Sequence, residues 1–444
     1  MSKLWKKDKD SLKSVERFTV GNDRTLDMQL AAFDVLGSLA HIRMLESIGL
    51  LTSEELRKLT VELKLIYERI QRDELKIEED TEDIHSQIEL ELTRKLGNTG
   101  KKIHSGRSRN DQVLVDIKMY LRFEIEEVVT ETKKLFDLLI TKSEKHKTDL
   151  LPGYTHFQPA MPSSFGLWFS AYAESLVDDL VMLEAAYRVV NKNPLGSAAG
   201  YGSSFPLKRK MTTHLLGFDE LNYNVVYAQL GRGKTERIVA AALAGIASTL
   251  GKLAADAIVF MNPNFGFISF PDELTTGSSI MPHKKNPDVF EIIRGRCNQL
   301  LALPNTITLV TANLPSGYHR DYQLLKEMLF PAIQHLKECL QMMHLMISDC
   351  AVKENILEDG RYIHLFSVEE VNKLVLQGVP FRDAYKKVGQ DIEKGDYRPH
   401  RNLRHTHEGS IGNLCLPEIQ RMMEDVLNRF NFAAVHRAYE NLVG

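Results

Sequence analysis

Cysteine is scarce in this 444-residue sequence, and its four cysteines lie far apart along the chain. They form no C-x-x-C pair, which argues against a zinc site or a disulfide framework and is typical of a reducing cytoplasm. A surplus of basic residues is lacking as well, because 56 Lys and Arg stand against 59 Asp and Glu. Proteins that bind nucleic acid usually carry such a surplus. The composition therefore predicts a cytoplasmic protein with no metal centre and no nucleic-acid partner.

The sequence also lacks a hydrophobic run long enough to cross a membrane. The nearest approach, IVAAALAGIASTLG at 238–251, falls short of the roughly 18–20 apolar residues needed and is rich in small residues. We expect a helix buried on all sides, because small residues let neighbouring helices approach closely. The basic N-terminal stretch, MSKLWKKDKDSLKS, is followed by no apolar core and no cleavage site, so a secretory signal is not expected.

Helical patterns dominate what is present. Residues 112–151 contain neither Gly nor Pro, and Leu114, Leu121, Val128 and Leu135 recur at every seventh position. A helix of this length would form a rod of roughly 60 Å. Alternating strand patterns are scarce. Further helices are expected at 167–193, at 235–262, after Pro287 and at 322–348.

We predict a mainly α fold with three domains. Residues 1–110 form a mixed domain of shorter helices, 111–355 a domain of long helices, and 356–444 a smaller helical domain. The chain length also suits about three domains. Long helices cannot bury their apolar stripes in a small monomer, so we expect a central bundle completed by other subunits. A monomeric helical array is the alternative.

Three segments match known binding motifs only in part. GRGKT at 231–235 ends like a phosphate-binding loop, but Ala228 occupies the position of the first glycine. GSAAGYGSS at 196–204 departs from the dinucleotide pattern because Phe205 stands where the third glycine belongs. We expect both to be turns between helices. HRNLRHTH at 400–407 lacks a cysteine or carboxylate cluster nearby, so a solvated loop is expected there and not a metal site.

Four other polar segments could supply site residues. In IHSGRSRNDQ, 103–112, Asn110 or Asp111 is a suitable cap for the long helix that follows. A capped helix start of this kind binds anions and carboxylates. The alternative for each segment is an ordinary capped turn or helix start. The remaining three are EDIHSQIE at 82–89, LPGYTHFQPAMP at 151–162 and YHRDYQLLKE at 318–327.

The most informative segment is TTGSSIMPHKKNPD, 275–288, which has neither a helical nor an alternating pattern. One glycine allows hinge motion, and two prolines restrict the backbone. Pro287 suits the first position of a helix, with Asn286 as its cap. The loop therefore has a flexible half with Ser278 and a rigid half with Lys284. That division is typical of a lid that closes over a small anionic substrate and excludes water.

The same loop carries a resemblance to a known family. GSSIMPHKKNP matches every fixed position of G-S-S-x-M-P-x-K-x-N-P, the signature of the fumarase/aspartase superfamily. Within that superfamily the chain resembles the argininosuccinate lyases, the parent family of the δ-crystallins. HSGRSRNDQ and GYTHFQPA are the distinguishing matches, and EDIH and the Y-x-x-D-x-Q-x-x-K pattern at 318–326 agree with them. The last part of the chain, beyond about residue 330, matches only loosely.

The resemblance implies an assembly and a reaction. It implies a homotetramer of largely helical, three-domain subunits, with active sites that each collect segments from three subunits. The implied reaction is the reversible elimination of fumarate from argininosuccinate, which leaves arginine and needs no metal or organic cofactor. The implied partners are thus the small-molecule substrate and further copies of the chain.

The resemblance also assigns catalytic roles to individual residues. Ser278 is the expected base, which removes a proton as its alkoxide, and Lys284 neutralises the charge that develops. His156 is expected to assist the leaving nitrogen, and Glu291 to orient its ring. The other expected site residues bind substrate: Asn286, Ser108, Arg109, Asn110 and Thr155 its carboxylates, and Asp83, His85, Tyr318, Gln323 and Lys326 its fumarate and arginine portions.

The sequence departs from the family pattern at a few positions. His283 stands where glutamine is usual, and Asp23 lies near a position usually held by serine. The loop PLGSAAGYGSSF, 194–205, is richer in small residues than expected. These changes leave open a substrate acylated on its α-amino group. Two further alternatives are another fumarate-releasing lyase, such as one resembling adenylosuccinate lyase or fumarase, and a non-catalytic homologue like a lens crystallin.

Overall fold

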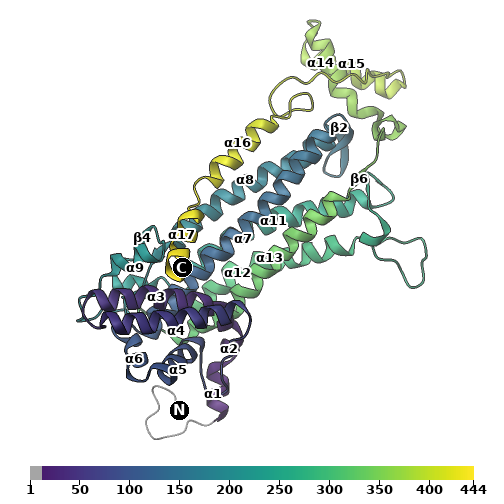
Figure 1. Ribbon diagram of the computed structural model, residues 1–444. Coiled ribbons are helices and arrows are strands. Elements are labelled where there is room, and N and C mark those ends of the chain that lie inside the picture. Colours follow the sequence, from purple (N-terminus) through teal and green to yellow (C-terminus); the bar gives the residue numbers. More distant parts are fainter. Residues whose placement is uncertain (1–12) are drawn as a thin grey trace.

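The computed structural model describes residues 13–444, and long helices that run side by side dominate it (Figure 1). The mainly α fold predicted from the sequence is confirmed. The bundle consists of α7 (Arg109–Lys145), α8 (Phe165–Val190), α11 (Lys234–Met261), α12 (Asp288–Thr311) and α13 (Leu324–Ser348). Each helix lies within a few residues of its predicted range, with one exception at the end of α7.

Helix α7 ends at Lys145, so the predicted helix to residue 151 was wrong at its C-terminus. Leu150 and Leu151 instead begin an antiparallel hairpin of β1 (Leu150–Thr155) and β2 (Gln158–Ser164). Pro152 follows at once, and proline cannot continue a helix. Sequence periodicity did not reveal the end of α7, because no helix breaker occurs before that proline.

Helix α11 lies at the centre of the bundle, packed against α8, α12 and α13. Ala240, Ala247 and Ala254 recur at every seventh position and are fully buried. Within residues 13–444, α11 is the one helix whose length and apolar composition would allow it to cross a membrane. However, 56% of its most apolar 18-residue stretch is buried inside the protein. The small residues therefore serve close helix packing, but the expected burial on all sides is not found in one chain, because Ala241 and Ser248 are exposed.

A second layer of shorter helices surrounds the start of α7. It comprises α1 (Lys13–Val20), α2 (Asp23–Asp27), α3 (Ala31–Ser47), α4 (Ser53–Gln71), α5 (Ile84–Leu96) and α6 (Asn98–Lys101). Helices α3, α4 and α5 share a hydrophobic core into which α7 contributes Val115 and Met119. Helices α9 (Arg209–Leu215) and α10 (Val225–Leu230) and the short parallel pair β3 (Lys192–Asn193) and β4 (Glu220–Leu221) complete this end.

The C-terminal region divides between the two ends of the molecule (Figure 1). Helices α14 (Ser367–Leu376) and α15 (Phe381–Lys394) have a small core of their own at the far end. Helix α16 (Leu416–Leu427) packs along α8, and α17 (Phe432–Val443) reaches α3. The pair β5 (Ile268–Ser269) and β6 (Ala351–Val352) lies beyond the bundle. Short 3-10 helices occupy Met28–Leu30, Lys102–His104, Asp272–Leu274, Arg320–Gln323, Ile356–Glu358 and Gly360–Phe366.

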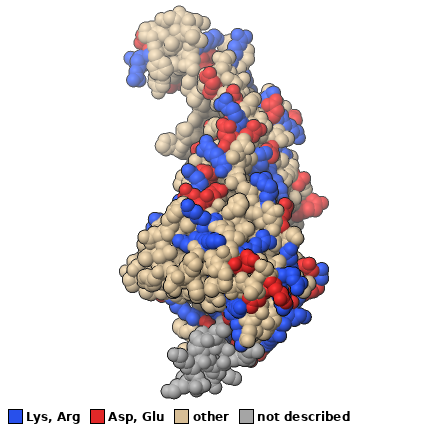
Figure 2. All heavy atoms as spheres, turned by 60° about the vertical axis from the view of Figure 1, so that its left-hand side comes forward, with Lys and Arg blue, Asp and Glu red and all other residues tan. Residues whose placement is uncertain are grey.

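On the face shown in Figure 2, basic and acidic side chains alternate along the length of the described chain. This distribution agrees with the near balance of charges in the sequence. It gives that face no single-sign field of the kind that steers a polyanion.

Arg122 of α7 holds the C-terminal helix in place. Its guanidinium is 1% exposed and donates to Asn191 Oδ1 at 3.0 Å, to the carbonyls of residues 216–217, and to the Tyr439 hydroxyl of α17. Buried carbonyls lose these hydrogen bonds if the donor is removed, and each unsatisfied group is costly.

We expect Arg122→Met to lower the free energy of unfolding by about 3 kcal/mol, since methionine fills space but donates no hydrogen bond. Urea denaturation followed by circular dichroism, at equal protein concentration, measures the change. Arg188→Met is the matched control, because the Arg188 side chain is 69% exposed. Equal loss in both variants would contradict a special role for Arg122.

Candidate active site

A polar cavity of about 220 Å³ lies between the N-terminal helices and the bundle. Its walls come from α2, from the starts of α5 and α7, and from the segment that leads into α13. Charged residues of both signs line it, so it suits a zwitterionic or multiply charged ligand. The lining residues are Asp23, Asp27, Glu82, Asp83, His85, Arg109, Asn110, Val113, Arg232, Tyr318, Arg320, Gln323 and Lys326.

Many of the predicted substrate-binding residues meet at this cavity. Eight predicted residues line this cavity or lie next to it, and we call them the cavity group: Asp83, His85, Ser108, Arg109, Asn110, Tyr318, Gln323 and Lys326. They come from segments up to about 240 residues apart in the sequence, and packing alone brings them together.

Ser108, and not Asn110 or Asp111, is the N-cap of α7, so that prediction was wrong. The Ser108 hydroxyl accepts from the Asn110 N–H at 3.3 Å, and Asp111 Oδ1 accepts from the Ser108 N–H at 2.8 Å. The other Asp111 oxygen accepts from the N–H groups of Gly196 and Ala198, both at 2.8 Å. Asp111 thereby fixes the glycine-rich loop after α8 beside the start of α7.

Arg109 and Asp83 form an ion pair at the cavity wall. Asp83 is the N-cap of α5, where its Oδ1 accepts from the Ser86 N–H at 2.7 Å. Burial opposes ionisation of Asp83, but His85 and Arg109 outweigh it and hold the pKa of this carboxyl below its usual value. A substrate carboxylate must therefore compete with Asp83 for Arg109.

Lys326 is shared by two carboxylates of α2. Its Nζ lies 2.7 Å from Asp23 Oδ1 and 2.6 Å from Asp27 Oδ1, and the lysine is 5% exposed. Burial lowers the pKa of Lys326, but Asp27 and Asp23 raise it further, so the ammonium is retained. Burial raises the pKa of Asp23 to about 6, although Lys326 opposes that shift. When both carboxyl groups are ionised, Lys326, Asp23 and Asp27 together carry one net negative charge.

Gln323 and Arg320 tie the first helix to the cavity. The Gln323 side-chain amide donates to the carbonyls of Thr19 and Val20, both at 2.9 Å. Arg320 donates to Thr19 O at 2.9 Å and pairs with Glu82 at 2.7 Å. Gln323 thus positions the N-terminal segment and also lines the cavity, and its contact with substrate stays a prediction.

Sequence reasoning missed several residues of this cavity. Asp27, Glu82, Arg232 and Arg320 line it but were not predicted as site residues, and Asp23 was noted only as a departure. The spacing of Asp23 and Asp27 on one helix face, four residues apart, was an available signal.

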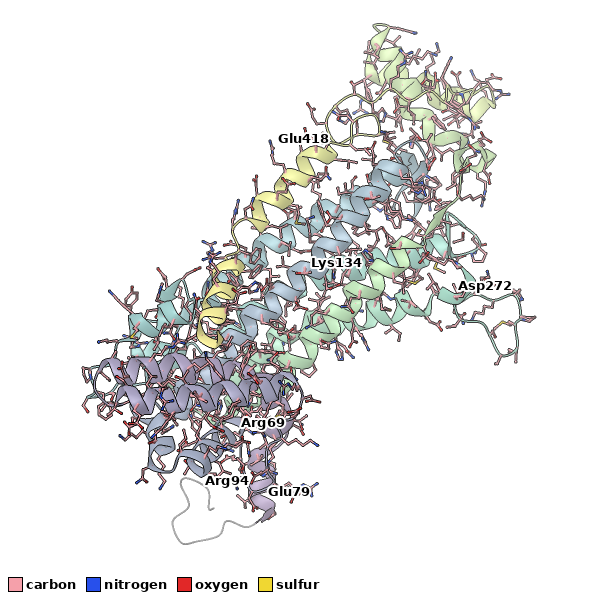
Figure 3. The ribbon with its side chains drawn as sticks, viewed as in Figure 1. Arg69, Glu79, Arg94, Lys134, Asp272 and Glu418 are labelled. Atoms are coloured by element: carbon pink, nitrogen blue, oxygen red, sulfur yellow. The ribbon has the colours of Figure 1, made fainter. Side chains whose placement is uncertain are left out.

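The predicted lid lies far from this cavity, beyond the N-terminal end of α12. In Figure 3, Asp272 marks that end of the molecule, whereas Arg69 and Arg94 mark the layer around the cavity. Four predicted residues lie in this loop or in the first turn of α12, and we call them the loop group: Ser278, Lys284, Asn286 and Glu291.

The neck of the loop is closed by pairing between Thr276 and Asn286. The Asn286 N–H donates to Thr276 O at 2.8 Å, and its side chain donates to Gly277 O at 3.2 Å. Asn286 therefore does not cap α12, which begins at Asp288 with Pro287 as its N-cap residue. The expected cap was wrong because the asparagine is used to join the two sides of the loop.

Ser278 sits at the exposed tip of the loop. Its Oγ accepts from the N–H groups of Ile280 at 3.3 Å and Met281 at 3.2 Å. A neutral hydroxyl accepts both of these hydrogen bonds, and the same two donors would also stabilise an alkoxide at this oxygen.

The third group lies on the hairpin after α7. We call Thr155 and His156 the hairpin group. They lie at the two-residue turn between β1 and β2, which His156 and Phe157 form. These turn residues have φ of 54° and 57°, and His156 is exposed. A left-handed backbone without glycine costs roughly 1–3 kcal/mol per residue, and such strain clusters at functional sites. The tight turn holds the imidazole out at the tip of the hairpin.

The cavity group cannot meet the other two groups within one chain. Helix α7 separates the cavity group from the hairpin group, and its 37 residues span about 55 Å. Helix α12 separates the cavity end from the loop group, and its 24 residues span about 36 Å. A single chain thus holds all the predicted site residues, but its cavity group lies at the opposite end from its hairpin and loop groups.

Two of the three partial motifs have structural roles in helix contacts. Gly233 is the N-cap residue of α11, where Arg232 pairs with Glu236 at 3.0 Å. His400 and His405 bind Glu370 and Glu369 of α14, each at 3.0 Å, and hold the polar loop against that helix. Among the described residues, one group has ligand atoms close enough for a metal ion, namely Asp34, His85 and Asp116. Asp34 Oδ1 also accepts from Gln112 at 2.6 Å.

Comparison with known proteins places the chain in a family. A family model described as lyase matches residues 3–301. The argininosuccinate lyase of Bacteroides thetaiotaomicron is 61% identical over 442 residues, which cover 100% of this chain and 99% of that protein. The argininosuccinate lyase of Thermotoga neapolitana is 38% identical over 87% of this chain and 98% of its own length.

Solved structures share the fold. EDDS lyase in complex with formate has a TM-score of 0.77 at 21% identity, covering 96% of this chain and 93% of that one. A class II fumarase from Schistosoma mansoni has a TM-score of 0.71 at 14% identity, covering 86% and 88%. The signature loop, the helical bundle and the full-length relatives agree, and the chain belongs to the argininosuccinate lyase family of enzymes.

Proposed function

We propose that this protein catalyses the reversible cleavage of argininosuccinate into arginine and fumarate, in the cytoplasm and as a step of arginine biosynthesis. The observation that carries the proposal is the 61% identity to an argininosuccinate lyase over 100% of this chain. The intact loop GSSIMPHKKNP supports it, because a homologue without activity would be free to lose that pattern.

The reaction requires a base and fixed positive charge. A proton leaves a carbon next to a carboxylate, and the resulting doubly charged carboxylate must be stabilised before the C–N bond breaks. Ser278 is the proposed base, since its oxygen is already held by two N–H donors. Lys284 would face the developing charge, where a fixed donor or cation is typically worth about 3–4 kcal/mol.

The leaving guanidinium needs a proton donor on the opposite side. We assign this role to His156, acting directly or through water, and assign Glu291 to orient the imidazole by a hydrogen bond. Asn286 and Thr155 would bind substrate carboxylates. The two partners of the His156–Glu291 pair belong to different groups, so they come from different subunits in this proposal.

The proposed assembly is a homotetramer whose sites each combine the three groups from three chains. Two features of the single chain support it. The cavity group lies tens of ångströms from the hairpin group and from the loop group, as the lengths of α7 and α12 require. Large apolar side chains of the bundle, including Met182, Ile292 and Leu309, are exposed in one chain, and burying them against other copies is favourable.

The cavity favours a substrate with a free α-amino group over an acylated one. Asp23 and Asp27 share the single ammonium of Lys326, and all three are largely buried. An additional ammonium group would neutralise the remaining negative charge, whereas an acylated nitrogen carries no charge and fills more space.

We therefore expect kcat/KM for free argininosuccinate to exceed that for its N-acetyl form by about 100-fold, the value of one lost buried charge pair. Fumarate formation measured with both compounds gives the ratio. Asp23→Asn should narrow the ratio, since it removes the additional carboxylate. A preference for the acylated compound would contradict this assignment of the cavity.

The function itself is tested by incubating the protein with argininosuccinate, adenylosuccinate and malate and following fumarate absorbance. Fumarate should appear rapidly from argininosuccinate alone, and the rate should survive dialysis against a chelator. Turnover of adenylosuccinate or malate would indicate a sibling enzyme. A folded tetramer inactive on every substrate would indicate a crystallin-like homologue.

A further inference from the structure

Behind the cavity wall lies a buried cluster of Asp34 from α3, His85 from α5 and Asp116 from α7. The side chains of both acids are 0% exposed, and that of the histidine is 4% exposed. Their polar atoms lie within 4.8 Å of one another. Two carboxylates this close and this deeply buried cannot both be charged without strong repulsion, so the pair holds a proton.

The hydrogen bonds show which carboxylate is the anion. Asp34 Oδ1 accepts from Gln112 Nε2 at 2.6 Å and lies 3.0 Å from His85 Nδ1. Neither oxygen of Asp116 has a hydrogen-bond partner, although its Oδ2 lies 3.4 Å from His85 Nδ1. Asp34 Oδ2 also lacks a donor. Burial and the neighbouring Asp34 raise the pKa of Asp116 well above its ordinary value, and a protonated Asp116 can donate to Asp34. Asp34 is therefore the anion and Asp116 the neutral acid.

His85 lies near acids of α2, α3 and α7 and near Asp83 at the start of its own helix, and it also lines the cavity. Burial lowers the pKa of His85, but Asp34, Asp83 and Asp27 outweigh it and raise the pKa above its ordinary value. The opposing burial and the His85 charge leave the pKa of Asp34 at about 2. The Nε2 atom of His85 is buried without a hydrogen-bond partner. The charged or titratable groups around the cluster are Asp27, Asp34, Asp83, Asp116, His104, Arg107 and Arg109.

We propose that Asp34 is a positioning residue that keeps His85 as an imidazolium, and that this fixed cation helps the cavity to attract a carboxylate of the substrate. Asp116 carries a proton, so the two buried acids together bear only one negative charge. The inference rests on the proposed function, because it assigns the cavity to a substrate end that bears a carboxylate. Like Arg109, the imidazolium would act on binding, so KM changes more than kcat.

The pH dependence has a definite sign. The pKa of His85 is raised in the folded protein, so the imidazolium is fully present below the ordinary histidine value and is lost as pH rises through the raised value. We expect KM to increase on the alkaline side of that raised pKa while kcat changes less.

Two isosteric substitutions test the assignment. Asp34→Asn removes the anion beside His85 and should lower the pKa of His85 and raise KM about tenfold near pH 8. Asp116→Asn replaces a neutral acid by a neutral amide and should shift the pKa of His85 much less. A purely structural role would make the two variants alike. Equal shifts in both would therefore overturn the proposal.

The readout that does not depend on activity is the NMR titration of histidine Cε1 in the free tetramer, with the His85 signal assigned through His85→Gln. A charged His85 at pH 7 in the wild-type protein is expected, and a neutral one would overturn the proposal even if Asp34→Asn failed to fold. Failure of the proposed function is separate, since it would appear as a wild-type protein with no turnover of argininosuccinate.

Discussion

Ser278→Ala is expected to lower kcat by about 10²- to 10⁴-fold, the range typical of a lost general base. Alanine lacks the oxygen that accepts from the N–H groups of Ile280 and Met281, so no alkoxide can form at that position. The side chain is small and lies at an exposed loop tip, so folding and assembly should not change. Steady-state fumarate formation measures the loss, and light scattering measures the assembly.

Ser279→Ala is the matched control, because it removes a hydroxyl from the next residue of the same exposed loop. Its kcat should stay within a few-fold of the wild type, and KM should be similar. If Ser278→Ala retained near-normal turnover while both proteins assembled alike, the base would lie elsewhere and the proposed role of the loop would be wrong.

Mixing two inactive variants should restore activity when their changes lie in different groups. His156→Asn disables the hairpin group, and Lys284→Met disables the loop group, yet each chain keeps the other group intact. After dissociation and random reassembly of equal amounts, about one quarter of the sites would combine two intact groups. We therefore expect activity to rise from near zero to about a quarter of the wild-type value.

The control mixture pairs Ser278→Ala with Lys284→Met, two changes in the loop group. Every chain then carries a defective loop, so reassembly should restore nothing. Native mass spectrometry can verify that mixed tetramers form in both experiments. Mixed tetramers that stay inactive for the hairpin and loop pair would show that the two groups do not meet across subunits.

Much of the fold was predictable from local patterns. The seven-residue repeat from Leu114 to Leu135 predicted α7, and proline marked the ends of α8 and α11 within a few residues. Helix caps were less predictable. Asn110, Asp111 and Asn286 are all good capping residues, but Ser108 caps α7 and Asn286 pairs with Thr276 instead. Several residues in a row satisfied the local rule, and tertiary contacts decided among them.

The candidate site was likewise predictable from the sequence only in part. The motifs around Ser278 and Arg109 were recognisable because their residues are consecutive, and their chemistry follows from side-chain type. Asp23 and Asp27 became site residues only when α13 placed Lys326 within 2.7 Å of both. The sequence likewise contains no sign that Asp34 and Asp116 are neighbours, since they are far apart along the chain and ordinary in their local context.

The long helices, the family and the types of side chain that the chemistry requires could be read from the sequence, because periodicity and motifs are properties of consecutive residues. The structure was needed to show that the cavity group lies at the opposite end from the hairpin and loop groups, and that a buried pair of acids lies behind His85. Proximity between distant residues depends on how whole helices pack, and rigid rods such as α7 and α12 hold their two ends apart.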